Sequence, residues 1–204
     1  MLDGSARKLI DPTLDKTGAF LASKGITANT VTIASFVIGM IAAGFIIFGY
    51  MITGLILLLL SRGGDGLDGA VARHSQSTDF GGFLDIVLDF VFYGAIPLAF
   101  IIHDPANNAI AGAVLLFSFY VNGASFLAYS VLAEKKDIST QVRGKKSIYF
   151  TTGIAEASET FIVFSIFCLF PNWFEVVAYV FATICFYTAF SRIMLAWNEF
   201  GQGD

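Results

Sequence analysis

The chain has 204 residues, of which 56% are hydrophobic and 14% are charged. Because soluble domains carry about 25% charged residues, the twelve basic and sixteen acidic side chains are too few to cover a soluble globular particle. The apolar composition, with four prolines, also excludes a disordered chain. The net charge of −4 says less than the positions of the charges, and the composition is typical of a protein that crosses a membrane several times.

Residues 1–24 contain charged side chains but neither the apolar run nor the small-residue cleavage site of a signal peptide. Their apolar residues have partly helical spacing, broken by Pro12; they are Leu9, Ile10, Leu14, Phe20 and Leu21. This pattern predicts a short amphipathic helix on the membrane surface, with a disordered cytoplasmic tail as the alternative.

No charged residue lies between Lys24 and Arg62. As one helix this run would extend for about 55 Å, whereas the hydrocarbon core of a bilayer is about 30 Å thick. We therefore expect the run to fold back at Gly49 and Tyr50 and to form two membrane helices.

Apolar runs predict six spans, at about 29–48, 52–73, 80–102, 108–133, 148–170 and 174–197. Segments rich in turn-forming residues, 104–108 and 171–172, separate the third span from the fourth and the fifth from the sixth. We predict an all-α integral membrane protein with six transmembrane helices preceded by an N-terminal amphipathic surface helix. The whole chain, 1–204, is one domain, in which 1–24 form the surface helix and 25–204 the transmembrane bundle.

If the chain crosses the membrane six times, all the basic residues lie on the side of the membrane that holds the N-terminus. The turns on the opposite side carry Asp104 and Glu175 but no Lys or Arg. The positive-inside rule places both termini and the loop 134–146 in the cytoplasm. The basic residues are Arg7, Lys8, Lys16, Lys24, Arg62, Arg73, Lys135, Lys136, Arg143, Lys145, Lys146 and Arg192.

Charged residues return inside otherwise membrane-like sequence in residues 65–89, which read DGLDGAVARHSQSTDFGGFLDIVLD. Asp65 and Asp68 are three residues apart and Asp85 and Asp89 are four apart, so each pair shares one helix face. A short turn between the two helices would let the four carboxylates face one another at the cytoplasmic end. Desolvated carboxylates repel one another unless their oxygens bind a hard divalent cation, Mg²⁺ or Mn²⁺ rather than zinc. Two such ions could stabilise a phosphoryl displacement.

This stretch resembles the signature D-x2-D-G-x2-A-R-x7-8-G-x3-D-x3-D of the CDP-alcohol phosphotransferase (CDP-alcohol phosphatidyltransferase) family. The resemblance covers nearly the whole chain but is sharp only over 65–89. The first span begins ITANTVT, with Ala28 where the family often has proline. The residues at the fixed positions of the signature are Asp65, Asp68, Gly69, Ala72, Arg73, Gly81, Asp85 and Asp89.

The resemblance implies an enzyme that moves a substituted phosphate from a CDP-linked alcohol, commonly CDP-diacylglycerol, to an acceptor hydroxyl and releases CMP. It implies two divalent ions, Mg²⁺ or Mn²⁺, held by Asp65, Asp68 and Asp85, with Asp89 as general base and further metal ligand. Contacts to the cytidine nucleotide are implied for Asn29, Thr32, Gly69, Arg73 and Thr78.

The implied partners are CDP-diacylglycerol, a small alcohol acceptor, the lipid bilayer and a second copy of the chain in a homodimer, with no nucleic acid. Glycerol 3-phosphate and an inositol phosphate are the acceptors we consider first. The expected location is the bacterial inner (cytoplasmic) membrane, with the active site on the cytoplasmic side. The expected process is phospholipid biosynthesis.

Several charged residues outside the signature have two interpretations each. Arg62 could pair with a motif aspartate or extend to the lipid headgroups. Arg192 could line a pocket or extend to the lipid headgroups. Arg143, Lys145 and Lys146 could bind a phosphorylated acceptor. Alternatively, they could set the membrane topology and attract anionic lipid headgroups. Either the acceptor cavity or an internal hydrogen-bonded pair accounts for Glu156 and Glu159.

A competing function is a membrane cation transporter that uses the carboxylate cluster as its ion site. A transporter would place the carboxylates near the membrane midplane, with a path to both faces. The aspartates instead lie at one end of their predicted helices, which favours the enzyme.

Overall fold

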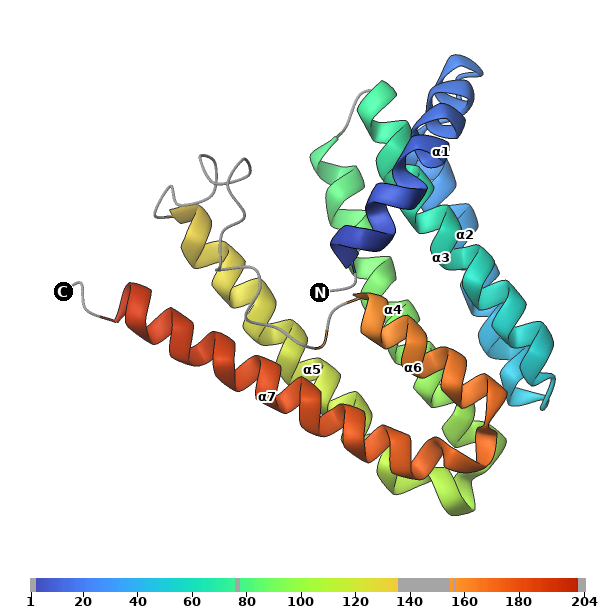
Figure 1. The fold of residues 1–204 in the computed structure, drawn as a ribbon, viewed down its shortest axis with the longest axis vertical. Helices are drawn as coiled ribbons and strands as arrows, with labels where there is room; N and C mark the ends of the chain where they lie inside the picture. Colours follow the sequence, from blue (N-terminus) through green and yellow to red (C-terminus); the bar gives the residue numbers. More distant parts are fainter. Residues whose placement is uncertain (1–2, 76–77, 136–154, 156, 202–204) are drawn as a thin grey trace.

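The computed structural model describes residues 3–75, 78–135, 155 and 157–201, with side chains in the first helix from Pro12 onward. Every regular element within these residues is helical (Figure 1). The elements are α1 (Asp3–Ser23), α2 (Ala28–Ile47), α3 (Met51–His74), α4 (Asp79–His103), α5 (Pro105–Lys135), α6 (Ala157–Leu169), the short 3-10 helix η2 (Pro171–Trp173) and α7 (Phe174–Phe200).

Local signals account for the ends of the first helices. Gly25 has a φ of +79°, a left-handed conformation that glycine adopts without steric cost and that turns the chain after α1. Thr27 then caps α2 by accepting a hydrogen bond from the Thr30 amide. Gly49 has a φ of +82° between α2 and α3, which confirms the predicted turn in the charge-free run.

The predicted spans correspond closely to the helices that the structure describes. Four of these helices, α2, α4, α5 and α7 with η2, are long and apolar enough to cross a membrane. α3 is 24 residues long but carries charged side chains in its second half, and α6 has 13 residues. The described residues are therefore all-helical, as predicted, and their apolar helices are compatible with an integral membrane protein. The six-span count remains a prediction, because residues 148–154 of the fifth span lie outside the described residues.

The helix predicted at the N-terminus is present, and it continues through Pro12 rather than ending there. α1 packs across α3, and the buried Gly18 lies where they touch. A side chain at this position would overlap Ala70 and Val71, so a residue without Cβ lets the two helix backbones meet. α1 is thus joined to the same half of α3 that carries the motif aspartates.

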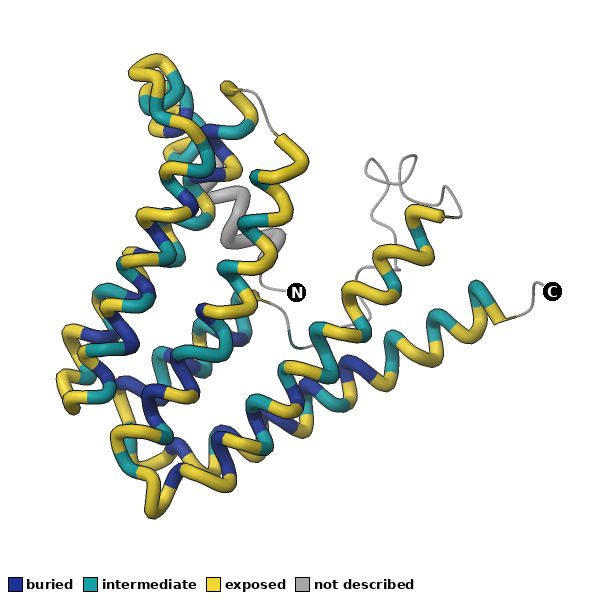
Figure 2. The backbone as a smooth tube through the Cα atoms, turned by 180° about the vertical axis from the view of Figure 1, so that it is seen from behind, coloured by how far each residue is buried: buried dark blue, intermediate teal, exposed yellow. Residues whose placement is uncertain are grey.

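The membrane helices form two groups that meet at one end. α2, α3 and α4 pack together, whereas α5 and α7 run side by side (Figure 1). α4, α5, α6 and α7 converge at the lower end of this view, and the upper ends of α5 and α7 lie apart from α2 and α3. Buried residues gather where the helices converge, while the upper parts of α5 and α7 are largely exposed (Figure 2).

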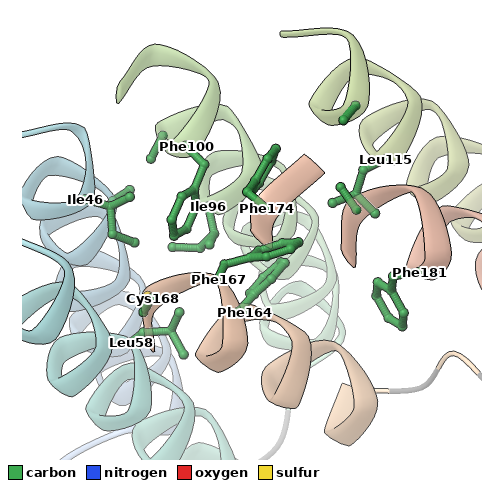
Figure 3. Close-up of a cluster of buried hydrophobic side chains, with 14 of the residues drawn as sticks. Ile46, Leu58, Ile96, Phe100, Leu115, Phe164, Phe167, Cys168, Phe174 and Phe181 are labelled. Carbon is green, nitrogen blue, oxygen red and sulfur yellow. The ribbon is translucent and has the colours of Figure 1, made fainter. Parts of the chain in front are cut away.

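Phenylalanines dominate the core at the convergent end (Figure 3). The ring centroids of Phe167 and Phe174 lie 4.5 Å apart, and those of Phe100 and Phe174 lie 5.2 Å apart. Close aromatic packing of this kind ties α4, α6 and α7 into one unit. The motif aspartates lie in the second half of α3 and the first half of α4, towards the other end of these helices.

Candidate metal and nucleotide site

α3 and α4 bring three of the four motif aspartates into one group. Asp65 and Asp68 lie one turn apart on α3, and Asp85 lies in the second turn of α4. Each of the three offers a carboxylate oxygen, and these oxygens all lie within 4.8 Å of one another. We refer to Asp65, Asp68 and Asp85 as the carboxylate cluster.

The donor set of the carboxylate cluster fits a divalent metal. Carboxylate oxygens are the ligands that Mg²⁺ and Mn²⁺ prefer, and three negative groups at this spacing repel one another without a cation. Asp68 is 7% exposed, so water screens this repulsion poorly there. The residues present therefore suit a bound divalent cation better than a metal-free state.

Thr32 approaches the carboxylate cluster from α2. Its hydroxyl donates a 2.6 Å hydrogen bond to Asp68 Oδ2, and both side chains are buried. The family resemblance implies a nucleotide contact for Thr32, and in the structure its hydroxyl contacts an aspartate of the cluster. A charge-assisted hydrogen bond of this length holds the carboxylate in one orientation.

Asp89, the fourth motif aspartate, forms an ion pair with Arg62. Its Oδ1 atom accepts a 2.8 Å hydrogen bond from Nη1 of Arg62, one helical turn before the cluster on α3. The same nitrogen lies 3.4 Å from Asp65 Oδ1. Of the two interpretations of Arg62, the structure therefore supports pairing with motif aspartates.

Two predicted nucleotide contacts lie together at the start of α4. Thr78 caps the helix by accepting a 3.0 Å hydrogen bond from the Gly81 amide. A Cβ built at Gly81 would lie 2.6 Å from Asn29 Oδ1 and 3.1 Å from Thr78 Oγ1. Glycine at this signature position thus allows the first turn of α2 to approach the first turn of α4.

Gly69 lies on an open part of α3. A Cβ built at this position would meet no neighbouring atom within 4 Å. The same is true of a Cβ built at Gly82 on α4. Gly64 is different, because a side chain there would overlap the hydroxyl of Ser35 on α2. The glycines of the motif region therefore divide into those that allow helix packing and those that leave free space beside the cluster.

Arg73 contacts Asp15 on α1. Its Nε atom lies 3.4 Å from Asp15 Oδ1, and the His74 ring nitrogen lies 3.1 Å from the same oxygen. The hydrogen bond from His74, with a smaller contribution from Arg73, holds the pKa of Asp15 below its ordinary value of 3.8. This contact was not predicted, because nothing in the sequence spacing relates residue 15 to residue 73.

The remaining charged candidates have different outcomes. Arg192 on α7 donates from Nη1 to the carbonyl and side-chain oxygens of Asn122, both at 3.0 Å, and to Ser125 at 2.6 Å. It therefore joins α7 to α5. Glu159 lines an apolar cavity of about 210 Å³ between α6 and α7. The candidates that lie outside the described residues are Arg143, Lys145, Lys146 and Glu156.

The helical membrane fold and the aspartate motif on α3 and α4 define a class of membrane-embedded transferase. A sequence model of the CDP-alcohol phosphatidyltransferase family matches residues 25–189, and the chain belongs to this family. It is therefore an enzyme, a CDP-alcohol phosphotransferase that transfers from a CDP-linked lipid to an alcohol. This confirms the resemblance noted in the sequence.

Two relatives match almost the whole chain. Inner membrane protein YnjF of Escherichia coli is 43% identical over 193 residues, which are 95% of this chain and 94% of that protein. An archaetidylinositol phosphate synthase of Pyrococcus horikoshii is 27% identical over 198 residues, which are 97% of each chain.

Solved structures with the same fold come from phosphatidylinositol phosphate synthase of Mycobacterium tuberculosis. The structure with bound CDP-DAG is 21% identical, with a TM-score of 0.73, and the comparison covers 94% of this chain and 96% of that one. The complex with manganese and citrate is 20% identical, with a TM-score of 0.75, and covers 94% and 92%. At this identity the likeness establishes the fold.

Proposed function

We propose that this protein transfers the phosphatidyl group of CDP-diacylglycerol to the hydroxyl of a small alcohol and releases CMP, as a step of phospholipid biosynthesis. The carboxylate cluster carries this proposal. Oxygens of Asp65, Asp68 and Asp85 within 4.8 Å of one another make a site for the divalent cation that a pyrophosphate substrate requires. Two ions, Mg²⁺ or Mn²⁺, are proposed, with Asp89 as a further ligand. When bound, they neutralise charge on the pyrophosphate as CMP leaves.

In the proposed reaction, Asp89 accepts the proton of the acceptor hydroxyl. The acceptor oxygen attacks the phosphorus that carries the diacylglycerol, the bond from this phosphorus to the oxygen of CMP breaks, and CMP departs with the bonding electrons. Asp89 is suited to the role of general base because its side chain is 29% exposed, on α4 one turn beyond Asp85. We propose direct transfer without a covalent enzyme intermediate.

The nucleotide is proposed to lie along the open face of α3 and the start of α4. Gly69 leaves room for it, and Arg73, 55% exposed, supplies a guanidinium for phosphate oxygens. Asn29 and Thr78 lie at the first turns of α2 and α4, where polar side chains can contact the base or ribose. Thr32 is proposed to act on the same substrate through the buried carboxylate of Asp68.

An inositol phosphate is the acceptor we propose first, and glycerol 3-phosphate second. Supporting the first choice, an archaetidylinositol phosphate synthase and phosphatidylinositol phosphate synthase are among the proteins that this chain resembles. The 43% identical relative carries a name that specifies no acceptor.

We further propose that the protein forms one domain over residues 1–204, with the surface helix at 1–24 and six spans over 25–204. The protein would lie in the inner membrane of a bacterium, with both termini and the active site on the cytoplasmic side. The name of the Escherichia coli relative supports this location. A homodimer is proposed as the working form.

The test is CMP release by purified protein in detergent with CDP-diacylglycerol, Mn²⁺ or Mg²⁺ and one acceptor at a time. The panel contains inositol 1-phosphate, glycerol 3-phosphate, inositol and serine. We expect stoichiometric CMP and phospholipid product with inositol 1-phosphate and loss of both on chelation of the metal. Absence of CMP with every acceptor, together with Mn²⁺ uptake by reconstituted vesicles, would support the transporter instead.

A further inference from the structure

Arg62 is a buried cation in the middle of the motif region, although it belongs to none of the fixed positions of the signature. Its side chain is 7% exposed. Nη1 lies 2.8 Å from Asp89 Oδ1 on α4 and 3.4 Å from Asp65 Oδ1 on α3. One guanidinium nitrogen therefore contacts one aspartate of the carboxylate cluster and the aspartate proposed as base.

Contacts from other directions hold the guanidinium in place. Its central carbon lies 3.8 Å from the ring centroid of Phe92, a fully buried residue of α4. Nη2 donates a 3.2 Å hydrogen bond to Ser61 Oγ, and Ser61 in turn donates to the carbonyl of Ser35 on α2. An arginine that merely extended to the lipid headgroups would be exposed and would lack these partners.

The geometry gives Arg62 a specific effect on Asp89. Asp85 and Asp89 are one helical turn apart, so the Asp89 carboxylate could rotate towards the carboxylate cluster. Its hydrogen bond to Arg62 instead fixes one oxygen on the guanidinium and leaves the second available. The planar, permanently charged guanidinium suits this task because it does not release its proton.

We infer that Arg62 is a positioning residue for the transfer reaction: it holds Asp89 in the orientation that proton acceptance requires. The inference rests on the proposed function, in which Asp89 is the general base. Arg62 acts through Asp89 and does not itself contact substrate.

The experiment measures CMP release and Mn²⁺-dependent thermal stabilisation in Arg62→Met, Asp89→Asn and the double variant. For Arg62→Met we expect kcat to fall about 100-fold, within the range lost when general-base catalysis fails. The KM for CDP-diacylglycerol should stay within twofold, and the Mn²⁺-dependent stabilisation should persist. The double variant should be no slower than Asp89→Asn, because Arg62 has no further effect once the base is absent.

Two further variants complete the design. Lys24→Met removes a basic residue from the same predicted membrane face, away from the carboxylate cluster, and should leave kcat unchanged. Arg62→Lys keeps the buried positive charge, so it serves if Arg62→Met does not fold. Lysine lacks the planar fork that joins Asp89 and Ser61, and we expect about a tenfold lower kcat.

The outcomes separate this inference from the proposed function. Wild-type kcat in Arg62→Lys or Arg62→Met overturns the positioning role, as does additive loss in the double variant. Loss of Mn²⁺-dependent stabilisation along with activity would mean that Arg62 organises the metal site instead. If the wild-type protein releases no CMP, or Asp89→Asn keeps full activity, the proposed function or its base has failed.

Discussion

The hydroxyl of Thr32 lies 2.6 Å from Asp68 Oδ2, so a residue of α2 orients an aspartate of α3. Both side chains are buried, and they are separated by 36 positions in the sequence. The helix that follows the surface helix is thereby part of the site. A change at Thr32 should alter both the stability of the fold and the chemistry of the carboxylate cluster.

We expect Thr32→Val to lower the free energy of unfolding by about 1–3 kcal/mol, because the buried Asp68 carboxylate loses its donor. The rate of CMP release should fall. The Mn²⁺ concentration that gives the half-maximal rate should also change. Thermal unfolding in detergent and a metal titration of turnover measure the two effects. Thr183→Val is the matched control, because Thr183 is exposed and bonds within α7. An unchanged melting temperature in Thr32→Val would contradict this account.

Asp85→Asn should raise the melting temperature of the metal-free protein, because one of three mutually repelling carboxylates is removed. It should also abolish the rise produced by Mn²⁺. In the wild type a cation at 100 times its dissociation constant should stabilise the fold by about 2.7 kcal/mol. Asp79→Asn removes an exposed carboxylate from the same helix and should keep the Mn²⁺ effect. An Mn²⁺ effect that survives in Asp85→Asn would place the metal elsewhere.

Three glycine-to-alanine changes on α3 should separate packing from substrate binding. Gly64→Ala forces a contact with Ser35 and should cost about 1–3 kcal/mol of stability. Gly69→Ala meets no protein atom, so the fold should be unaffected while CMP release falls about tenfold, or ~1.4 kcal/mol, because the nucleotide loses space. Gly63→Ala, also in open space, should change neither. Full activity in Gly69→Ala would remove this residue from the proposed nucleotide site.

Asp15→Asn should loosen α1 from α3, because Asp15 is the common partner of Arg73 and His74. Hydrogen exchange of the α1 amides at neutral pH should become faster than in the wild type. Lys16→Gln removes an exposed charge from the same helix and should leave exchange unchanged. Equal exchange in Asp15→Asn and the wild type would mean that apolar packing alone holds α1.

The same contact has a defined pH dependence. The pKa of Asp15 is lower in the folded protein than its ordinary value of 3.8, so its stabilising effect is complete above pH 3.8. It is lost as the pH falls below 3.8 through the folded-state pKa. Carboxyl NMR titration of Asp15, compared between the wild type and the His74→Ala variant, should give a higher pKa in the variant.

The helices were predictable from local features. A charge-free run too long for one span required a turn, and Gly49 supplies it. Hydrophobic runs placed the start of α2 and of α3 within one residue, because apolarity over about twenty residues leaves few alternatives in a membrane. The start of α5, predicted at 108, is at Pro105, since a polar first turn capped by Asp104 is not visible in hydropathy.

The motif aspartates were also predictable, because spacings of three and four residues place side chains on one helix face wherever the helix lies. The contacts of Arg62 were not. Extension towards headgroups and pairing with an aspartate were equally compatible with its position in the sequence. The packing of Phe92 and Ser61 around the guanidinium decides between them.

By itself, the sequence determined the membrane class, the helix positions and the presence of four acidic residues at one end of two helices, since these depend on composition and short-range periodicity. Only the tertiary structure decided that Asp65, Asp68 and Asp85 form one cluster, while Asp89 pairs with Arg62. It also decided that Thr32 contacts Asp68 and Asp15 contacts Arg73. These pairs join residues far apart in the chain, and their contacts depend on how the helices pack, which no local spacing encodes.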